Sequence, residues 1–161
     1  MTEQRSGEAV ESQIEATPPL NRMVVAVLAL IGMLISTYML LYHVGLIGSI
    51  MCGTGGCQTV QNSPWADVLG VPVPLIGLLG YGVLFLAALI GTRAGGLADR
   101  RIAAVLVTGA VIGAGFSIYL TYLEMYVIHA WCRWCIGSAV VAGLLFLAVI
   151  PEFARMRGSA S

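Results

Sequence analysis

Long apolar runs alternate with short polar segments along most of this chain. A helix needs about 20 apolar residues to cross the hydrocarbon core of a bilayer. Four runs of about that length contain no Lys, Asp or Glu, and they cover residues 23–42, 71–90, 102–122 and about 131–150. The pattern therefore predicts an all-α membrane protein that is a bundle of four transmembrane helices.

The polar segments at the two ends predict that the chain has a tail on each side of one membrane domain. Residues 1–21 are acidic and contain two prolines, and they lack the basic start of a signal peptide. We expect a disordered tail there. We assign residues 22–151 to the four-helix membrane domain and residues 152–161 to a second tail.

The arginines predict the orientation of the bundle. Loops that carry Lys and Arg stay on the cytoplasmic side of a membrane. Seven of the eight arginines fall on one side of the predicted bundle, namely Arg5, Arg22, Arg93, Arg100, Arg101, Arg155 and Arg157. We expect both termini in the cytoplasm of a cell with an inner (plasma) membrane, and the loop over residues 43–70 on the extracytoplasmic side.

Composition narrows the class of protein further. The chain is 58% hydrophobic and 10% charged, and its net charge is zero. Soluble domains carry about 25% charged residues, and nucleic-acid binders need a basic surface. We therefore expect membrane lipid, and no nucleic acid, around this chain.

All four cysteines fall on the predicted extracytoplasmic side, where an oxidising compartment permits disulfides. Cys132 and Cys135 have the C-x-x-C spacing of redox-active dithiols. If the last span begins near Ala130, both thiols lie in its first turn, where the helix dipole favours the thiolate. The thiolate is the form that attacks disulfides.

The other pair, Cys52 and Cys57, encloses a glycine-rich loop. Glycine leaves the backbone mobile and the sulfur atoms accessible, which is typical of a labile disulfide. A zinc site formed by all four cysteines is the rival interpretation, and stabilising disulfides are another. The sequence has no dinucleotide, phosphate-loop or haem motif. By elimination, a membrane quinone is the acceptor that we expect for electrons from the thiols.

The chain resembles the bacterial homologues of vitamin K epoxide reductase. The loop cysteine pair, the C-x-x-C at the start of the last span and the segments over residues 62–66, 69–72 and 77–81 carry the resemblance, which extends over residues 23–150. It implies four helices packed around a quinone, either menaquinone or ubiquinone. It also implies a short amphipathic helix, at about residues 58–69, that caps the quinone pocket.

The resemblance also implies a role for each cysteine. Cys135 lies nearest the quinone, Cys132 exchanges with Cys57, and Cys52 receives electrons from a thioredoxin-fold protein. Some bacterial members carry that partner as a fused domain. Because this sequence stops at Ser161, we expect a separate thioredoxin-fold partner.

Further residues are candidates for the quinone pocket. By the same resemblance, Ser63 matches a family position that lies near a quinone oxygen. Trp65 belongs to the family's loop motif over residues 62–66. The aromatic residues have an alternative role in the interfacial belt of a membrane protein, and an acidic residue near a span end can mark the water boundary. The full set of candidates is Ser63, Trp65, Tyr119, Tyr122 and Glu124.

These features together predict a quinone-dependent thiol:disulfide oxidoreductase. Electrons pass from the partner to the loop pair, then to the C-x-x-C pair, then to the quinone, and the process supports disulfide formation in exported proteins. One alternative is that reduction of vitamin K epoxide, or of a quinone, is the main role. Another is a membrane protein without enzymatic activity, in which the disulfides are structural.

Overall fold

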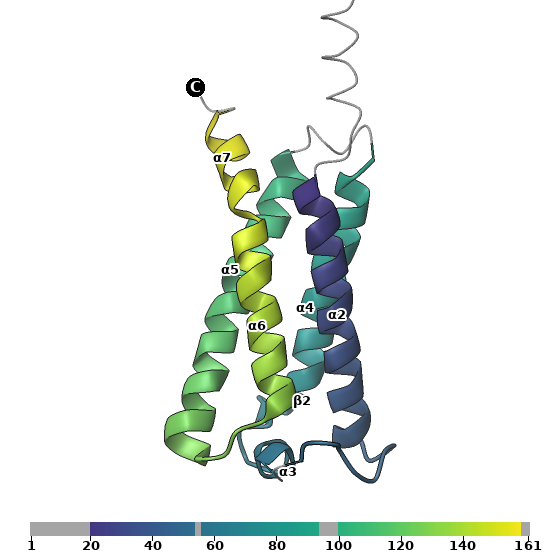
Figure 1. Cartoon of the computed structure of the whole chain (residues 1–161), viewed down its shortest axis with the longest axis vertical. Coiled ribbons are helices and arrows are strands. Elements are labelled where there is room, and N and C mark those ends of the chain that lie inside the picture. The colour runs from purple at the N-terminus through teal and green to yellow at the C-terminus, as the bar shows by residue number, and fades with distance from the viewer. Residues whose placement is uncertain (1–19, 54–55, 94–99, 159–161) are drawn as a thin grey trace, which may run out of the picture.

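A computed structural model describes residues 20–53, 56–93 and 100–158 of the chain. Its long helices run up and down in one bundle (Figure 1), and they are α2 (Leu20–His43), α4 (Val73–Gly91), α5 (Arg100–Leu123) and α6 (Arg133–Ala148). Within these described ranges, four helical segments are long and apolar enough to cross a membrane. The predicted all-α membrane bundle is confirmed, with boundaries shifted by a few residues.

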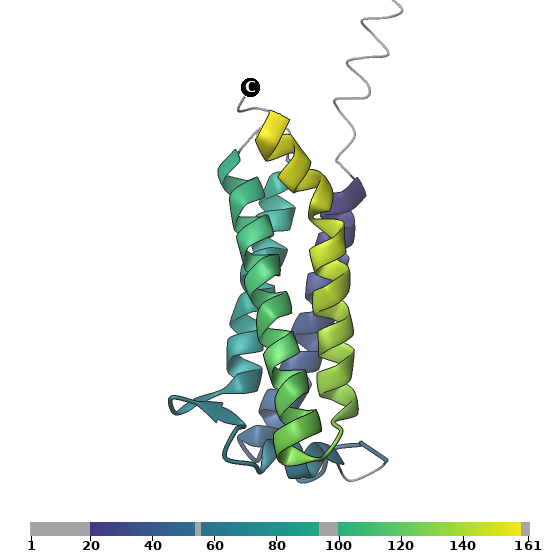
Figure 2. The same cartoon turned by 90° about the vertical axis from the view of Figure 1, so that its left-hand side faces the viewer.

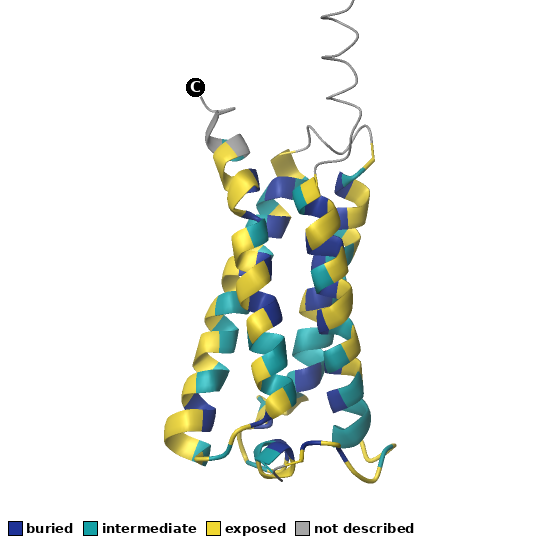
Figure 3. Cartoon of the chain, viewed as in Figure 1, coloured by how far each residue is buried: buried dark blue, intermediate teal, exposed yellow. Residues whose placement is uncertain are grey.

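The bundle buries one stripe of each helix and exposes the rest. Helix α2 packs on α4 and α6, and α5 packs on the same two helices. Buried side chains from all four helices form the core, among them Val25, Leu84, Leu106 and Leu145. The outer faces are exposed (Figure 3) and rich in large apolar residues. A bilayer-facing surface has this composition, since lipid tails are as apolar as these side chains.

A buried ion pair holds the helices together at the end of the bundle far from the cysteines. The Arg22 guanidinium donates to both carboxylate oxygens of Glu152 at 2.8 Å, and to the Gly91 carbonyl at 2.7 Å. Glu152 lies in a further helix, α7 (Ile150–Gly158). Glu152 is fully buried against Arg22, and helical structure continues to residue 158, within the segment predicted as the second tail.

The opposite end of the bundle is covered by the long loop between α2 and α4, which lies across the helix ends at the bottom of Figures 1 and 2. The loop contains one short helix, α3 (Gly56–Gln61). The predicted cap helix over residues 58–69 is thus wrong in its extent. A helix past Asn62 is disfavoured by Pro64, which has no N–H and restricts the residue before it.

A small antiparallel hairpin follows α3 and projects from the side of the bundle in Figure 2. It pairs β1 (Asp67–Val68) with β2 (Val71–Pro72). The two residues between the strands, Leu69 and Gly70, both have positive φ, as a two-residue hairpin turn requires. His43, at the end of α2, contacts the Asp67 carboxylate at 3.2 Å and so ties the hairpin to the bundle.

Candidate active site

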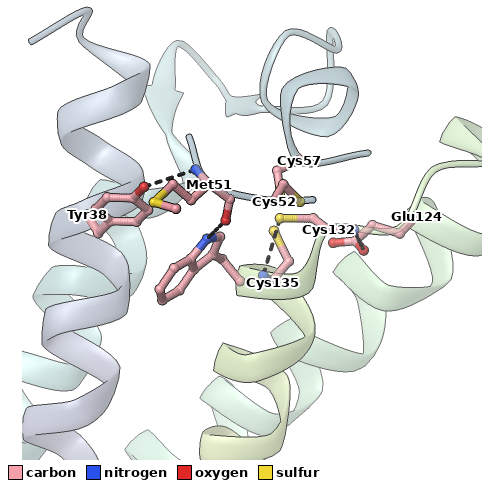
Figure 4. The surroundings of a disulfide bond; sticks show 8 residues. Tyr38, Met51, Cys52, Cys57, Glu124, Cys132 and Cys135 are labelled. Carbon is pink, nitrogen blue, oxygen red and sulfur yellow. Dashed lines mark hydrogen bonds between the residues drawn. A yellow bond between two sulfur atoms is a disulfide. The ribbon is translucent and has the colours of Figure 1, made fainter. Parts of the chain in front are cut away.

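The four cysteines meet beneath α3, at the capped end of the bundle. Cys52 and Cys57 form a disulfide, with their Cα atoms 5.9 Å apart. Cys132 and Cys135 are free thiols. Figure 4 shows the disulfide beside both of them. Cys52, Cys57 and Cys132 are buried together in one cluster, and Cys135 packs against it. The loop pair and the C-x-x-C pair, 75 or more residues apart in sequence, therefore form one site.

A glycine allows the two pairs to approach. A Cβ atom added at Gly56 would overlap the carbonyl of Trp131. Gly56 immediately precedes Cys57, and Trp131 immediately precedes Cys132. The close contact of the two backbones therefore places these cysteines side by side. A residue with a side chain at position 56 would force α3 away from the C-x-x-C segment.

Cys132 lies at the N-cap of α6, one residue before the helix begins. A helix that starts near residue 130, as the sequence predicts, would have Cys132 in its first turn, but α6 starts at Arg133. The reason is that Cys132 has extended dihedral angles (φ −96°, ψ 112°), and its sulfur accepts a hydrogen bond from the Cys135 N–H at 3.3 Å. A side chain that accepts from the first turn is the defining contact of an N-cap.

This geometry favours the thiolate of Cys132. A hydrogen bond from the Cys135 thiol lowers the pKa of Cys132, and the backbone N–H groups of Cys135 and Trp134 act in the same direction. Burial and the nearby Glu124 carboxylate oppose the shift without reversing it. The dipole at the start of α6 also favours negative charge at this position.

Glu124 is the acidic member of the site. It begins a π-helix, η1 (Glu124–Ile128), which follows α5 and ends at His129 in the left-handed conformation (φ 54°). Such π-helical turns are frequent at functional sites. The Glu124 carboxylate accepts the Cys132 backbone N–H at 3.0 Å and lies beside the Cys135 side chain. Only 3% of Glu124 is exposed, so its carboxylate faces the thiols rather than water.

An apolar cavity of about 410 Å³ opens directly beside Cys135. Cys135, Trp134 and Glu124 line its outer end, and Leu84 and Leu145 line it deeper in the bundle. The volume falls within the range of small-molecule pockets, which are mostly apolar with a few polar groups. A flat, lipophilic ring with two carbonyl oxygens fits this lining. The residues present are therefore compatible with a quinone.

The candidate pocket residues fall in different places. Glu124 lines the cavity, whereas Tyr119 and Tyr122 are 46% and 55% exposed on the outer face of α5. The helical period explains this difference, because positions 117, 120, 121 and 124 share the inner face and positions 119 and 122 do not. The two tyrosines were predicted at this cavity, and the structure does not bring them to it.

The two candidates in the loop, Ser63 and Trp65, do not line the large cavity. The Ser63 hydroxyl donates to the Val60 carbonyl at 2.7 Å. Trp65 borders a separate, smaller cavity of about 40 Å³, which Glu124 also lines. Neither Ser63 nor Trp65 lines the large cavity, so Glu124 is the candidate that the structure brings to it together with Cys135.

Several polar residues of the cavity were not among the predicted site residues. The Tyr81 hydroxyl bonds to the carbonyl and hydroxyl oxygens of Ser138, at 2.9 and 2.8 Å. Both side chains line the cavity, as do Ser36, Ser117 and Thr121. The sequence held a signal for Ser138, since a residue three positions after Cys135 lies on the same helix face. It held none for Tyr81, which reaches the cavity from a different helix.

The site does not fit the rival zinc interpretation. A zinc site of four cysteines needs four thiolates, and Cys52 and Cys57 are joined in a disulfide. The site also differs from that expected for two stabilising disulfides, because Cys132 and Cys135 are not joined to each other beside the Cys52–Cys57 disulfide. One disulfide adjacent to one dithiol is the arrangement needed for thiol–disulfide exchange.

Comparisons with known proteins agree with this chemistry. The sequence profile of the vitamin K epoxide reductase family matches residues 23–150. A curated relative from Arabidopsis thaliana, thiol-disulfide oxidoreductase LTO1, is 34% identical over 107 residues. The matched stretch covers 62% of this chain and 28% of the relative, so the chain spans less than a third of that protein.

Proposed function

The chain belongs to the vitamin K epoxide reductase family, and on that premise we propose that it is a membrane thiol oxidoreductase that transfers electrons from a thiol partner to a quinone. The observation that carries the proposal is the position of Cys135. This thiol lines the apolar cavity, and it packs against the cluster of Cys132 and the Cys52–Cys57 disulfide. An electron path between the loop pair and the cavity therefore needs no other redox group.

The redox states of the cysteines define one stage of the cycle. The loop pair is oxidised and the C-x-x-C pair is reduced. This is the state expected after electrons have moved inward from the loop and before they leave the protein. Oxidation of the C-x-x-C pair then completes the cycle.

The inward step consists of thiol–disulfide exchanges. A thiolate of the partner attacks Cys52, the Cys52–Cys57 bond breaks, and Cys57 leaves as a thiolate. A second partner thiol then releases Cys52. Cys57 attacks Cys132 of a closed C-x-x-C disulfide and Cys135 leaves as a thiolate, after which Cys52 attacks Cys57 and frees Cys132. Each step breaks one disulfide as it forms another, and the partner ends as a disulfide.

The outward step takes place at the cavity. A quinone bound there would supply the acceptor for two electrons and two protons. Cys132 and Cys135 give up two electrons as their disulfide closes. The Cys135 thiol supplies one proton, because Cys132 is already the thiolate, and water supplies the other. The hydroxyls of Tyr81 and Ser138 are bonded to each other in the apolar wall, and rotation of either would turn its hydrogen toward a bound oxygen.

Glu124 is the residue that we propose for proton transfer. Because Cys132 is the favoured thiolate, the remaining thiol proton is on Cys135. Glu124 lies beside the Cys135 side chain and lines the cavity. It takes the proton from Cys135 and releases it into the cavity, so that Glu124 returns to its starting charge after each turnover. Removal of a proton in step with bond formation is general acid–base catalysis.

The partner that we propose is a separate thioredoxin-fold protein on the extracytoplasmic side, and both termini are cytoplasmic. The arginine distribution supports this orientation, although Arg22 is buried and paired with Glu152. Cys52 and Cys57 are 4% and 0% exposed. An incoming thiolate needs an accessible sulfur, so binding of the partner must displace part of the loop.

Quinone reduction by the purified full chain tests the proposal. A reduced thioredoxin-fold protein serves as donor, short-tailed ubiquinone and menaquinone analogues serve as acceptors, and absorbance follows the quinone. We expect turnover by the wild type and none by Cys135→Ala. Equal rates for the two proteins would contradict the thiol relay, and so would an absence of turnover by the wild type with every acceptor.

A further inference from the structure

The backbone of Met51, the residue before Cys52, is held from both sides (Figure 4). Its N–H donates to the Tyr38 hydroxyl at 3.1 Å, and its carbonyl accepts the Trp134 indole N–H at 3.1 Å. The Met51 side chain takes no part in this, since the residue is 84% exposed. The loop is thus fixed by its main chain immediately before its first cysteine.

The two side chains that hold Met51 come from different helices. Tyr38 belongs to α2, and Trp134 lies between Cys132 and Cys135 in α6. Their rings pack at a centroid distance of 4.8 Å and a tilt of 50°, within the range of favourable aromatic pairs. Both rings also pack against the buried cysteine cluster. We call Tyr38 and Trp134 together the Met51 clamp.

The clamp lies beside the atoms of the thiol–disulfide exchange between the two cysteine pairs. Such an exchange requires three sulfur atoms in close alignment, and its rate falls steeply when one of them is misplaced. The loop before Cys52 is not part of a helix or strand from Val44 onward. Fixing Met51 restricts the positions that Cys52 and Cys57 can take relative to Cys132.

We propose that Tyr38 and Trp134 are positioning residues that hold the loop cysteines against Cys132 and thereby determine the efficiency of exchange between the two pairs. The proposal rests on the proposed function only in assigning the exchange of Cys57 with Cys132. It concerns the internal step and neither the partner nor the quinone. In that step the Cys57–Cys132 bond forms, the Cys132–Cys135 bond breaks, and Cys135 leaves with the electron pair.

The experiment measures how readily Cys57 and Cys132 bond to each other. In the full-length Cys52→Ser/Cys135→Ser protein, these are the two remaining cysteines. Equilibration in detergent with defined ratios of reduced and oxidised glutathione, followed by alkylation and mass analysis, gives the effective concentration of one thiol toward the other. No quinone and no partner are needed.

Tyr38→Phe and Trp134→Phe each remove one hydrogen bond and keep an aromatic ring. We expect each to lower the effective concentration about fivefold, which corresponds to a net hydrogen bond of about 1 kcal/mol. Tyr42→Phe and Trp131→Phe are the matched controls. Tyr42 packs against the same cluster, and neither side chain holds Met51, so both controls should match the unsubstituted background.

A second measurement separates positioning from a general loss of structure. In a Cys52→Ser/Cys57→Ser protein, the glutathione equilibrium of the Cys132–Cys135 disulfide should stay within about twofold when Tyr38→Phe is added, because that pair is local to α6. A comparable fall in both equilibria would overturn the proposal, and so would clamp variants that match their controls. If Cys57 and Cys132 do not bond in the unsubstituted background, the relay of the proposed function falls as well. Failure of quinone turnover alone leaves the clamp proposal standing.

Discussion

The Cys132 sulfur accepts a hydrogen bond from the backbone N–H of Cys135, 3.3 Å away. The relationship depends on the position of Cys132 at the N-cap of α6, where its backbone is extended. It gives the two cysteines of one short motif different chemistry. Cys132 is buried and favoured as the thiolate, while Cys135 lines the cavity.

This difference predicts the pH dependence of alkylation at Cys132. The pKa of Cys132 is lowered, first of all by the hydrogen bond from the Cys135 thiol, so its thiolate persists below the usual thiol pKa of about 8.5. In the reduced protein, the alkylation rate of Cys132 should therefore reach half its maximum below that pH. Cys135→Ala removes the hydrogen bond and should move the midpoint upward. An unchanged midpoint in Cys135→Ala would show that Cys135 does not stabilise the thiolate.

Replacement of Glu124 tests the proposed proton transfer. Glu124→Gln keeps an oxygen that can accept the Cys132 N–H but cannot take up a proton. We expect the rate of quinone reduction by pre-reduced protein to fall by about 10²-fold or more, the usual contribution of general acid–base catalysis. Near wild-type rates of quinone reduction by Glu124→Gln would exclude the role.

The close approach at Gly56 predicts a loss of contact between the cysteine pairs. Gly56→Ala places a methyl group where the Trp131 carbonyl lies, so α3 must move away from it. We expect the effective concentration of Cys57 toward Cys132 to fall about tenfold or more, in the glutathione assay described for the Met51 clamp. Gly48→Ala is the control, because a Cβ atom there meets nothing within 4 Å. Equal falls in the effective concentration for the two substitutions would contradict a close contact between Gly56 and Trp131.

Filling the cavity tests whether it holds the quinone. Gly113 lines the cavity, and a Cβ atom there meets nothing within 4 Å. Gly113→Leu should therefore fold normally and raise the KM for a quinone about tenfold or more, because the added side chain occupies the space of the ring. The control is the glutathione equilibrium of Cys57 and Cys132, which should not change. An unaltered KM would place the quinone elsewhere.

The buried ion pair at the other end predicts a large effect on stability. Arg22→Ala leaves the Glu152 carboxylate buried without its main partner, and loss of one member of such a pair costs about 3–5 kcal/mol. The Arg22→Ala/Glu152→Ala double variant should lose less free energy of unfolding than the sum of the single variants. Denaturant titration in mild detergent, with helical circular dichroism as readout, gives the three values. Additive losses would show that the two side chains act independently.

The hydrophobic pattern predicted the bundle well because the bilayer imposes a length on each apolar run. It does not predict two other features. The cap helix, which the resemblance implies over residues 58–69, ends at Gln61 before Pro64. Helix α7 continues through residues 152–158, and its Glu152 pairs with Arg22. That pairing joins residues 130 positions apart, and no periodicity along the chain reveals it.

The four cysteines and Glu124 could be singled out from the sequence because each residue type carries its chemistry with it. The residues that line the cavity could not be predicted from the sequence in the same way. Tyr119 and Tyr81 are both tyrosines in apolar helices, yet one faces outward and the other bonds to Ser138. Only the rotation of each helix in the bundle distinguishes them. The same holds for Trp134, whose indole reaches Met51 in a loop 83 residues away.

The Arg22–Glu152 pair has a mechanical consequence for the bundle. With the Gly91 carbonyl, it joins α2, α4 and α7 at the end far from the thiols. This contact fixes the spacing of the three helices at one end, whereas the loop that has to give way to a partner covers the other end. Because the ion pair lies at one end of the bundle and the cysteines at the other, a tilt of a helix about Arg22 would displace its cysteine end more than its Arg22 end.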